Sequence, residues 1–171
     1  MDDVARLAAK DEIRDLVLRY CRAIDRRNFD ALPPLFSVDA LDDHGAYYQG
    51  PAAGFIEALP EIMAPMKVTS HQVFNHLIAL EGDHAEGEVY VQAFHHYDDE
   101  NGDPIDATVG GRYLDKYCRE EGVWRFCHRK IVLDWNAIGP SRCDWDDPSA
   151  TGTPRGSDGL YDPSSDFFKL I

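Results

Sequence analysis

The sequence predicts an α+β protein in which N-terminal helices pack on one face of a curved antiparallel sheet. Apolar residues first recur at steps of three or four, and beyond Lys67 they alternate with polar residues instead. A period near 3.6 indicates amphipathic helices, and a period of two indicates half-buried strands. Because the two patterns occupy separate parts of the chain, the elements do not alternate as they would in a parallel α/β fold.

The first helix is predicted over residues 4–28. Its apolar stripe consists of Ile13, Leu16, Val17, Tyr20 and Ile24. A shorter helix is predicted over residues 29–35, because Asn28 can cap it and because Pro33 and Pro34 suit a first turn.

Residues 39–48 then predict a pair of short strands around a turn that contains Gly45. Gly50 and Pro51 begin a third helix, which Pro60 kinks or splits. The apolar set of this helix consists of Phe55, Ile56, Leu59, Ile62, Met63 and Met66.

Four long strands follow, separated by short turns rich in Gly, Asp and Asn. They cover residues 69–80, 85–97, 107–118 and 124–135. Such short connections join neighbouring strands as antiparallel hairpins. We therefore predict a sheet of four long strands plus two short ones.

The composition changes at residue 138, beyond which glycine and proline interrupt every periodic pattern. We predict one domain over residues 1–137 and an extended tail over residues 138–171. The end of this tail, residues 167–171, is apolar enough to dock on a surface. Whether the tail lies over its own domain, reaches a neighbouring subunit or covers a pocket is left open by the sequence.

The chain of 171 residues is acidic, with 17 Lys and Arg against 31 Asp and Glu and a formal net charge of −14. This charge argues against nucleic acid and anionic membranes as partners, because binding to them needs a basic surface. No window reaches the about 18 apolar residues of a membrane span, and the acidic start Met1-Asp2-Asp3 is unlike a signal peptide. We therefore expect a cytoplasmic protein with a neutral, largely apolar ligand.

The spacing of the cysteine, histidine and glycine residues reveals no metal or cofactor motif. The cysteines form no CxxC pair, and we expect them to be buried: Cys21, Cys118, Cys127 and Cys143. His95 and His96 are adjacent on a strand and His71 and His76 are five apart, so each pair is expected to point to opposite faces. Gly110-Gly111 lies inside a strand and not at a strand-to-helix turn, where a phosphate loop would be. We expect no metal and no cofactor.

Three polar residues stand where the pattern favours apolar ones. Asp25 ends the first helix at the margin of its apolar stripe, where a carboxylate opposes the helix dipole and needs a partner. His71 shares its predicted face with Val73 and Asn75, and Arg129 likewise alternates with apolar residues. If these faces are concave, the three groups line one cavity. A solvated helix end, a hydrogen-bonded core histidine and a surface cation are the alternative interpretations.

The last long strand also predicts an oligomer. Trp124, Phe126 and Val132 are expected on the face opposite Arg129. One of the two faces then needs a cover other than the pocket, and a homodimer or homotrimer provides it.

Five segments carry a further signal. They are residues 20–32 (beginning Tyr-Cys-Arg-Ala-Ile-Asp), 69–71 (Thr-Ser-His), 110–117 (Gly-Gly-Arg-Tyr-Leu-Asp-Lys-Tyr), 122–129 (Gly-Val-Trp-Arg-Phe-Cys-His-Arg) and 134–135 (Asp-Trp). Together they resemble a SnoaL-like member of the nuclear-transport-factor-2-like superfamily, nearest to the branch of hexachlorocyclohexane dehydrochlorinase and scytalone dehydratase. The resemblance implies a cone-shaped, cystatin-like α+β barrel with a deep pocket between sheet and helices.

The resemblance also implies a catalytic site. In that branch an Asp near the end of the first helix orients a His on the first long strand, which acts as general base, and Asp25 and His71 match these positions. Arg129 matches a pocket arginine, which would stabilise developing negative charge. Further candidates for substrate contact are Tyr20, Tyr47, Tyr48 and Asn75.

The chain also departs from the branch. Tyr20 stands where the dehydrochlorinase has a second basic residue, and Gly110, Gly111 and Arg112 stand where the dehydratase has a further His. The substrate therefore does not carry over. We expect a cofactor-independent lyase or isomerase that acts on a neutral, hydrophobic, cyclic or aromatic small molecule. The alternative is a non-catalytic small-molecule-binding protein, or a small subunit associated with a ring-hydroxylating oxygenase.

Overall fold

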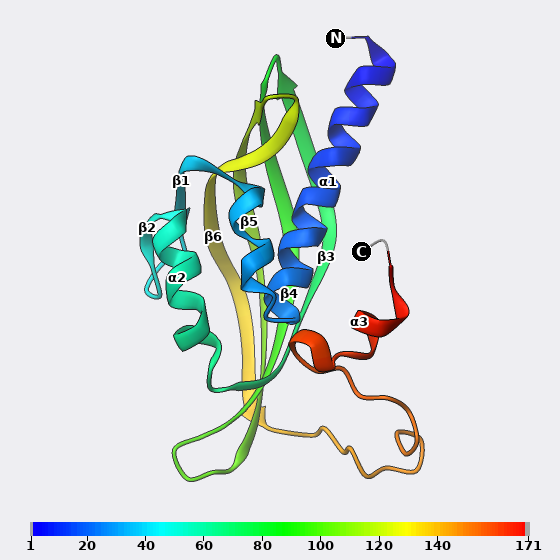
Figure 1. Cartoon of the computed structure of the whole chain (residues 1–171). Coiled ribbons are helices and arrows are strands. Elements are labelled where there is room, and N and C mark those ends of the chain that lie inside the picture. Colours follow the sequence, from blue (N-terminus) through cyan, green and yellow to red (C-terminus); the bar gives the residue numbers. More distant parts are fainter. Residues whose placement is uncertain (1, 170–171) are drawn as a thin grey trace.

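Helix α1 (Asp3–Asp25) lies along the concave face of a curved sheet in the computed structural model, which describes residues 2–169 (Figure 1). The side chain of Asp2 caps its start by accepting a hydrogen bond from the Ala5 amide at 2.8 Å. The helix ends three residues before the predicted boundary, and Arg27 takes a positive φ of 50° just beyond it. Its buried face includes the predicted stripe. This exit places Asp25 at the last helical position.

The segment after α1 differs in detail from the prediction. Residues 29–35 form two short 3-10 turns, η1 (Phe29–Ala31) and η2 (Pro33–Leu35), because the proline pair cannot donate the hydrogen bonds of a continuous helix. The short strand pair consists of β1 (Phe36–Asp43) and β2 (Gln49–Pro51). Helix α2 (Ala52–Met63) follows with Pro60 inside it.

The long strands agree with the prediction and are somewhat longer. They are β3 (Met66–Glu81), β4 (His84–Asp98), β5 (Pro104–Glu120) and β6 (Val123–Pro140). Within the described residues the sheet has six strands in the order β2-β1-β6-β5-β4-β3. The α+β class and the curved sheet are confirmed, but β1 pairs with β6 in parallel, and β2 and β3 remain as free edges. The sheet therefore curves around α1 without closing into a barrel (Figure 1).

A register shift in β3 changes which residues face α1. Val73 pairs with Val91 and His76 with Val89, so β3 carries one extra residue between these pairs. Such a bulge reverses the alternation of the side chains beyond it. His71 and His76 therefore both face the interior, contrary to the prediction that they point to opposite faces. Asn75, predicted on the face of His71, is exposed.

A second shift, in β6, has the same effect. Lys116 pairs with His128 but Tyr117 pairs with Phe126, which leaves Cys127 as the extra residue. Phe126 consequently shares the interior face with Arg129, and Trp124 is buried as well. The prediction that these aromatic residues cover the opposite face was wrong, so the argument for an oligomer loses this support, and the homodimer or homotrimer stays a prediction.

Aromatic side chains join α1 to the sheet. The ring of Tyr20 makes edge contacts with Phe36, Tyr113 and Phe126 at centroid distances of 6.1, 6.2 and 5.9 Å. This geometry is favourable for aromatic pairs. The α1–sheet interface is therefore the hydrophobic core, and it holds the C-terminal end of α1 against the sheet.

The tail runs from the end of β6 back to the C-terminal end of α1 (Figure 1). It contains η3 (Gly159–Tyr161) and α3 (Pro163–Phe167). Arg26 donates to Asp162 at 2.8 Å, and the Gly159 amide donates to the Arg26 carbonyl at 2.7 Å. Of the predicted docking end, Phe167 and Phe168 are exposed, and residues 170–171 lie outside the described residues. Over the range that the structure describes, no helix is long and apolar enough to cross a membrane.

Candidate active site

Asp25 and His71 form a hydrogen-bonded dyad between α1 and the edge strand β3. Asp25 Oδ1 lies 2.6 Å from His71 Nδ1, and Asp25 Oδ2 accepts the backbone N–H of His71 at 2.8 Å. The side chains are 11% and 12% exposed. Both carboxylate oxygens are thus bound by one residue, which holds the imidazole ring in a single orientation.

Hydrogen bonds from His71 stabilise the Asp25 carboxylate at the C-terminal end of α1, where the helix dipole disfavours a negative charge. Helix C-termini carry partial negative charge, so a carboxylate there is stabilised only by donors from outside the helix. The N–H groups of His71 provide them. A carboxylate at Nδ1 places the ring hydrogen on that nitrogen and leaves a lone pair on Nε2. Among the described residues, Nε2 has no hydrogen-bond partner and is not one of the fully buried unpaired atoms.

A second histidine stands beside the dyad. The ring of His95 meets that of His71 edge to face at 5.8 Å, and its Nδ1 lies 2.9 Å from Thr69 Oγ1. Burial, followed by the nearby His71, lowers the pKa of His95 to about 4, against an opposing effect of Asp25. His95 is therefore neutral at physiological pH. Sequence reasoning missed it because only the register of β3 and β4, which pairs Thr69 with His95, reveals the contact.

Arg129 belongs to a different cluster. Its Nε and Nη2 donate to the two carboxylate oxygens of Asp115 at 2.8 and 2.7 Å, and neither side chain is exposed. The guanidinium carbon lies 4.1–4.2 Å from the ring centroids of Tyr20, Tyr113 and Phe126. Burial alone would lower the pKa of Arg129, but the Asp115 charge raises it well above the usual value, so the group stays cationic.

Cross-strand pairing connects His71 on β3, through one residue each on β4 and β5, to Asn136 on β6. Arg129 lies far from Asn136 along β6, so it is not in line with the dyad. Of the predicted site residues, the structure thus brings Asp25 and His71 together and encloses Arg129 elsewhere with Tyr20. Burial raises the pKa of the Tyr20 hydroxyl above its usual range.

Two other residues predicted to contact the substrate, Tyr47 and Tyr48, are not part of the dyad. Tyr47 is 77% exposed. Tyr48 is half-buried, donates its hydroxyl hydrogen to the Pro51 carbonyl at 2.8 Å and packs against Phe55. Neither shares a hydrogen bond with the dyad.

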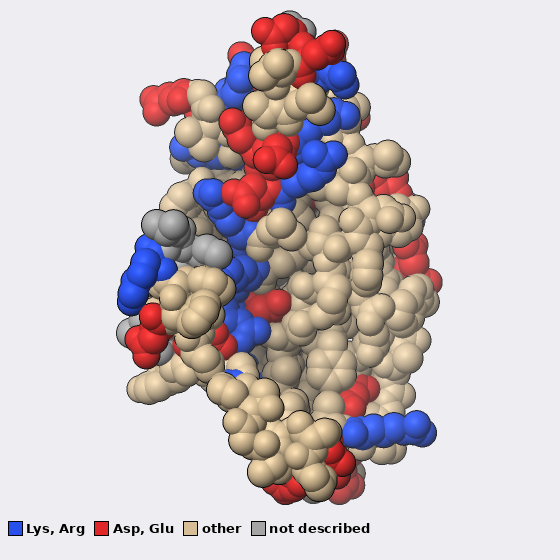
Figure 2. Space-filling model, turned by 90° about the vertical axis from the view of Figure 1, so that its right-hand side faces the viewer, with Lys and Arg blue, Asp and Glu red and all other residues tan. Residues whose placement is uncertain are grey.

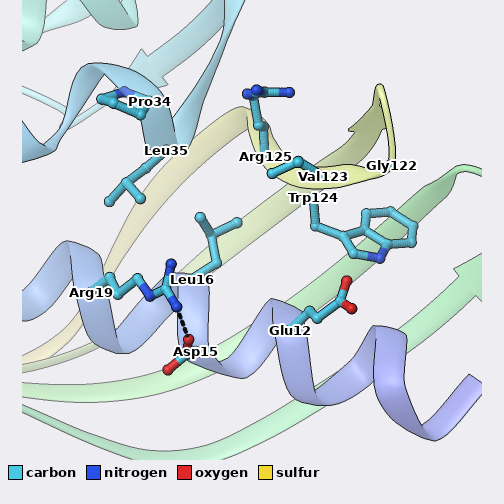
Figure 3. A pocket seen from close by; sticks show the side chains of 10 residues that line it. All are labelled: Glu12, Asp15, Leu16, Arg19, Pro34, Leu35, Gly122, Val123, Trp124 and Arg125. Atoms are coloured by element: carbon cyan, nitrogen blue, oxygen red, sulfur yellow. Dashed lines mark ion pairs between the residues drawn. The ribbon is translucent and has the colours of Figure 1, made fainter. Parts of the chain in front are cut away.

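Two hollows on the described part of the surface are lined by residues other than the dyad. One of about 420 Å³ lies between α1, η2 and the β5–β6 turn, with the Asp15–Arg19 ion pair of 2.6 Å at its rim (Figure 3). The other, of about 630 Å³, lies on β3 to β6 and includes His128 and Lys130. The dyad is instead at the sheet edge, where β3 carries charge only at Lys67 and Glu81, near its ends.

Charged groups are unevenly distributed around this edge. Figure 2 shows Lys and Arg side chains mixed with Asp and Glu on one part of this face, next to a broad surface that carries few charges.

Comparison with known proteins decides the family. Residues 5–130 match the family model described as SnoaL-like domain. The chain belongs to the SnoaL-like family. Proteins of Mycobacterium tuberculosis (Rv2910c) and Mycobacterium bovis (Mb2934c), both described as uncharacterized, are 31% identical over 91 residues, which is 52% of this chain and 62% of each relative. The match thus spans less than two thirds of these relatives.

Solved structures share the fold. A hexachlorocyclohexane dehydrochlorinase (LinA type 2) has a TM-score of 0.73 at 22% identity, covering 86% of this chain and 99% of that one. A putative scytalone dehydratase from Novosphingobium aromaticivorans has a TM-score of 0.70 at 22% identity, covering 80% and 91%. A putative aromatic ring hydroxylase from the same organism has a TM-score of 0.62 at 25% identity, covering 75% and 90%. The predicted resemblance and fold are confirmed for this SnoaL-like protein.

Proposed function

We propose that this SnoaL-like protein is a cofactor-independent lyase or isomerase in which His71 removes a proton from a neutral, hydrophobic small molecule. One observation carries the proposal: both oxygens of Asp25 bind His71, at the ring Nδ1 and at the backbone N–H, and Nε2 has no hydrogen-bond partner among the residues that the structure describes. This is the arrangement that a histidine general base requires.

The dyad is suited to a simple proton transfer. Nε2 accepts the proton of a C–H bond that lies beside a leaving group or a carbonyl. In the first case the C–H electrons form a double bond and the leaving group departs with its electron pair; in the second they form an enolate, which is reprotonated at another carbon. The imidazolium that forms is stabilised by the negative charge of Asp25. His95, neutral and adjacent, is placed to serve as a second proton-transfer group.

Arg129 takes a positioning role in this proposal. Its guanidinium is enclosed by Asp115 and three aromatic rings, so it has no free face for a substrate. It holds Tyr20, and through it the last turns of α1, against the sheet. The position of Asp25 depends on that packing.

The charge distribution supports a neutral ligand. The chain has a formal net charge of −14, which repels anions at long range. The strand that carries His71 presents mostly uncharged side chains. Two structural neighbours, a dehydrochlorinase of hexachlorocyclohexane and a putative scytalone dehydratase, support a cyclic or aromatic ligand.

A non-catalytic role is the second candidate. The side chains of the dyad are only 11–12% exposed, which favours a structural hydrogen bond. The neighbour named as a putative aromatic ring hydroxylase favours a small subunit of a ring-hydroxylating oxygenase. Copurification with a large iron-dependent subunit would support this alternative.

The experiment uses a panel of neutral cyclic and aromatic compounds incubated in D₂O, with elimination and deuterium incorporation followed by NMR. We expect His71→Ala to lose the reaction that the unmodified protein shows. His76→Ala is the matched control, because His76 lies on the same strand and also faces the interior but contacts Tyr117 instead of Asp25. Full activity in His71→Ala would refute the proposal. Compounds that bind without reacting would support the non-catalytic role.

A further inference from the structure

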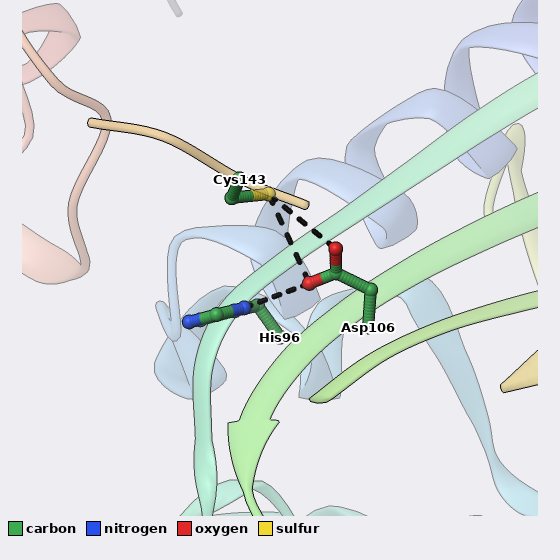
Figure 4. A group of neighbouring side chains, drawn as sticks. All are labelled: His96, Asp106 and Cys143. Carbon is green, nitrogen blue, oxygen red and sulfur yellow. Dashed lines mark hydrogen bonds and ion pairs between the residues drawn. The ribbon is translucent and has the colours of Figure 1, made fainter. Parts of the chain in front are cut away.

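A second cluster of polar side chains lies on the opposite side of the sheet from the dyad. His96 on β4, Asp106 on β5 and Cys143 after β6 meet there (Figure 4). Asp106 Oδ1 lies 2.8 Å from His96 Nδ1, and Cys143 Sγ lies 3.8 and 3.7 Å from the two carboxylate oxygens. His95 and His96 are consecutive on β4, so one faces the dyad and the other faces this cluster.

The backbone holds the three residues in place. His96 and Asp106 are direct partners in the β4–β5 register. The Ser141 amide donates to the Pro104 carbonyl at 2.8 Å, and the Arg142 amide donates to Asp106 Oδ2 at 2.9 Å. The chain beyond β6 is thereby turned so that Cys143 comes to Asp106. Cys143 is exposed, unlike Cys21, so the prediction of buried cysteines was wrong here.

The cluster brings together three side-chain atoms that could bind a metal ion. The ring nitrogen His96 Nδ1 lies within reach of both Asp106 Oδ1 and Ser141 Oγ, the latter at 3.3 Å. One ring nitrogen offers either one hydrogen or one lone pair, so its short contact is with Asp106, while Ser141 Oγ also accepts the Cys143 N–H at 3.1 Å. A nitrogen, a carboxylate oxygen and a sulfur atom all lie within 4.8 Å of one another. Such a mixed donor set is typical of a transition-metal site.

We infer that His96, Asp106 and Cys143 bind a divalent transition-metal ion of the Zn²⁺ class, which clamps the start of the tail to the sheet. Thiolate and imidazole ligands favour such ions and disfavour Mg²⁺ and Ca²⁺, which take oxygen ligands. The carboxylate and the thiolate supply two negative charges that balance the ion. The fourth position of a tetrahedral site is left for water.

The N···O and S···O separations of the ligands need little adjustment. In a tetrahedral zinc site the N···O and S···O separations of the ligands are roughly 3.3 and 3.5 Å, from bond lengths near 2.0 and 2.3 Å. The observed S···O distances of 3.7–3.8 Å already come close. The N···O distance would open by about 0.5 Å from its present 2.8 Å. The Arg142 amide would keep Asp106 Oδ2 oriented, as groups around metal ligands commonly do.

The site would be structural. It lies across the sheet from His71 and contacts residues at the start of the tail, so it does not reach the proposed substrate. It does not depend on the proposed function.

The experiment is a titration of the full chain with Co²⁺, which gives an ultraviolet charge-transfer band only when a thiolate is bound. We expect a saturable band with one equivalent, its displacement by Zn²⁺, and its loss in Cys143→Ser. His96→Ala and Asp106→Asn should each weaken binding at least tenfold. The matched control is Cys118→Ser combined with Cys127→Ser, because Cys118 also contacts a carboxylate, that of Glu120 at 3.5 Å. This control should retain the band.

Tryptic cleavage provides a second measurement. Arg142 lies directly before Cys143, so Zn²⁺ should slow cleavage there in the unmodified protein and not in Cys143→Ser. A band that persists in Cys143→Ser, or saturating Co²⁺ without any thiolate band, would overturn the inference. Equal cleavage at Arg142 with and without Zn²⁺ would show that the metal ion does not fix the start of the tail to the sheet.

Discussion

Replacing Asp115 by Ala tests the buried ion pair that supports the interface between α1 and the sheet. Asp115 accepts hydrogen bonds from Arg129 Nε and Nη2 at 2.8 and 2.7 Å and from the Tyr117 hydroxyl at 2.9 Å. Both partners of the pair have 0% side-chain exposure, and Arg129 Nη1 has no partner within the described residues. Without the carboxylate, a fully buried guanidinium charge loses its partner, and the Tyr117 hydroxyl loses the shorter of its two hydrogen bonds.

The expected loss of unfolding free energy is large. Removing one partner of a buried ion pair costs roughly 3–5 kcal/mol, because the remaining charge is left uncompensated. The Tyr117 hydroxyl loses its 2.9 Å hydrogen bond and keeps only the longer contact with His76 Nε2 at 3.3 Å, which adds about 1 kcal/mol. We therefore expect Asp115→Ala to lose about 4–6 kcal/mol, a large part of the stability of an ordinary domain. Urea unfolding followed by tryptophan fluorescence measures this difference.

The chain offers a matched control. Asp134 also binds an arginine with both oxygens, Arg112 at 2.9 and 3.0 Å, but these side chains are 37% and 28% exposed. Asp134→Ala should cost at most about 1 kcal/mol, since exposed ion pairs contribute little. Combining Arg129→Met with Asp115→Leu should recover most of the loss because it removes the unpaired charge. The reasoning fails if Asp115→Ala is no less stable than Asp134→Ala.

Three other outcomes are expected. Asp25→Asn should lower turnover by roughly 10⁴-fold with the fold intact, because an amide can donate to Nδ1 of His71 and shift the ring hydrogen to Nε2. Steady-state kinetics measure the turnover and circular dichroism checks the fold. Unchanged turnover would contradict the prediction. Burial lowers the pKa of His95 to about 4, so as the pH falls the unfolded chain binds a proton at this residue before the folded chain does. The free energy of unfolding should therefore decrease between about pH 6.5 and 4. In urea unfolding at several pH values, His95→Gln should reduce this pH dependence; an unchanged pH dependence would show that it does not come from His95. Gly111→Ala should lower the free energy of unfolding by about 1–3 kcal/mol, because a Cβ would lie 2.3 Å from the Val132 carbonyl oxygen. Gly139→Ala is the control: no atom lies within 4 Å of a Cβ there, so this variant should lose far less in the same assay.

The element types were predictable because they depend on local patterns. The helical period of α1 and the alternation in β3 to β6 extend over many residues each, and each pattern specifies one kind of element. The two 3-10 turns at residues 29–35 were less predictable, since three or four residues carry no period.

Which side chains meet was predictable only in part. Asp25 and His71 were paired in advance through the family resemblance, and the structure brings them together. Arg129 was placed in the same cavity, but the bulge at Cys127 and the competing carboxylate of Asp115 enclose it in the core. A bulge adds one residue to a strand without a distinctive sequence signal, and every face assignment beyond it is reversed.

The sequence by itself determined the order of helices and strands, the family and the two residues of the dyad, because periodicity and short segments around functional residues are local properties of the chain. Only the tertiary structure decided that His95 stands beside His71, that Arg129 pairs with Asp115, and that His96, Asp106 and Cys143 converge. Each of these contacts depends on strand register or on the path of the tail. Register arises from the sum of many side-chain contacts across the sheet, which no single segment encodes.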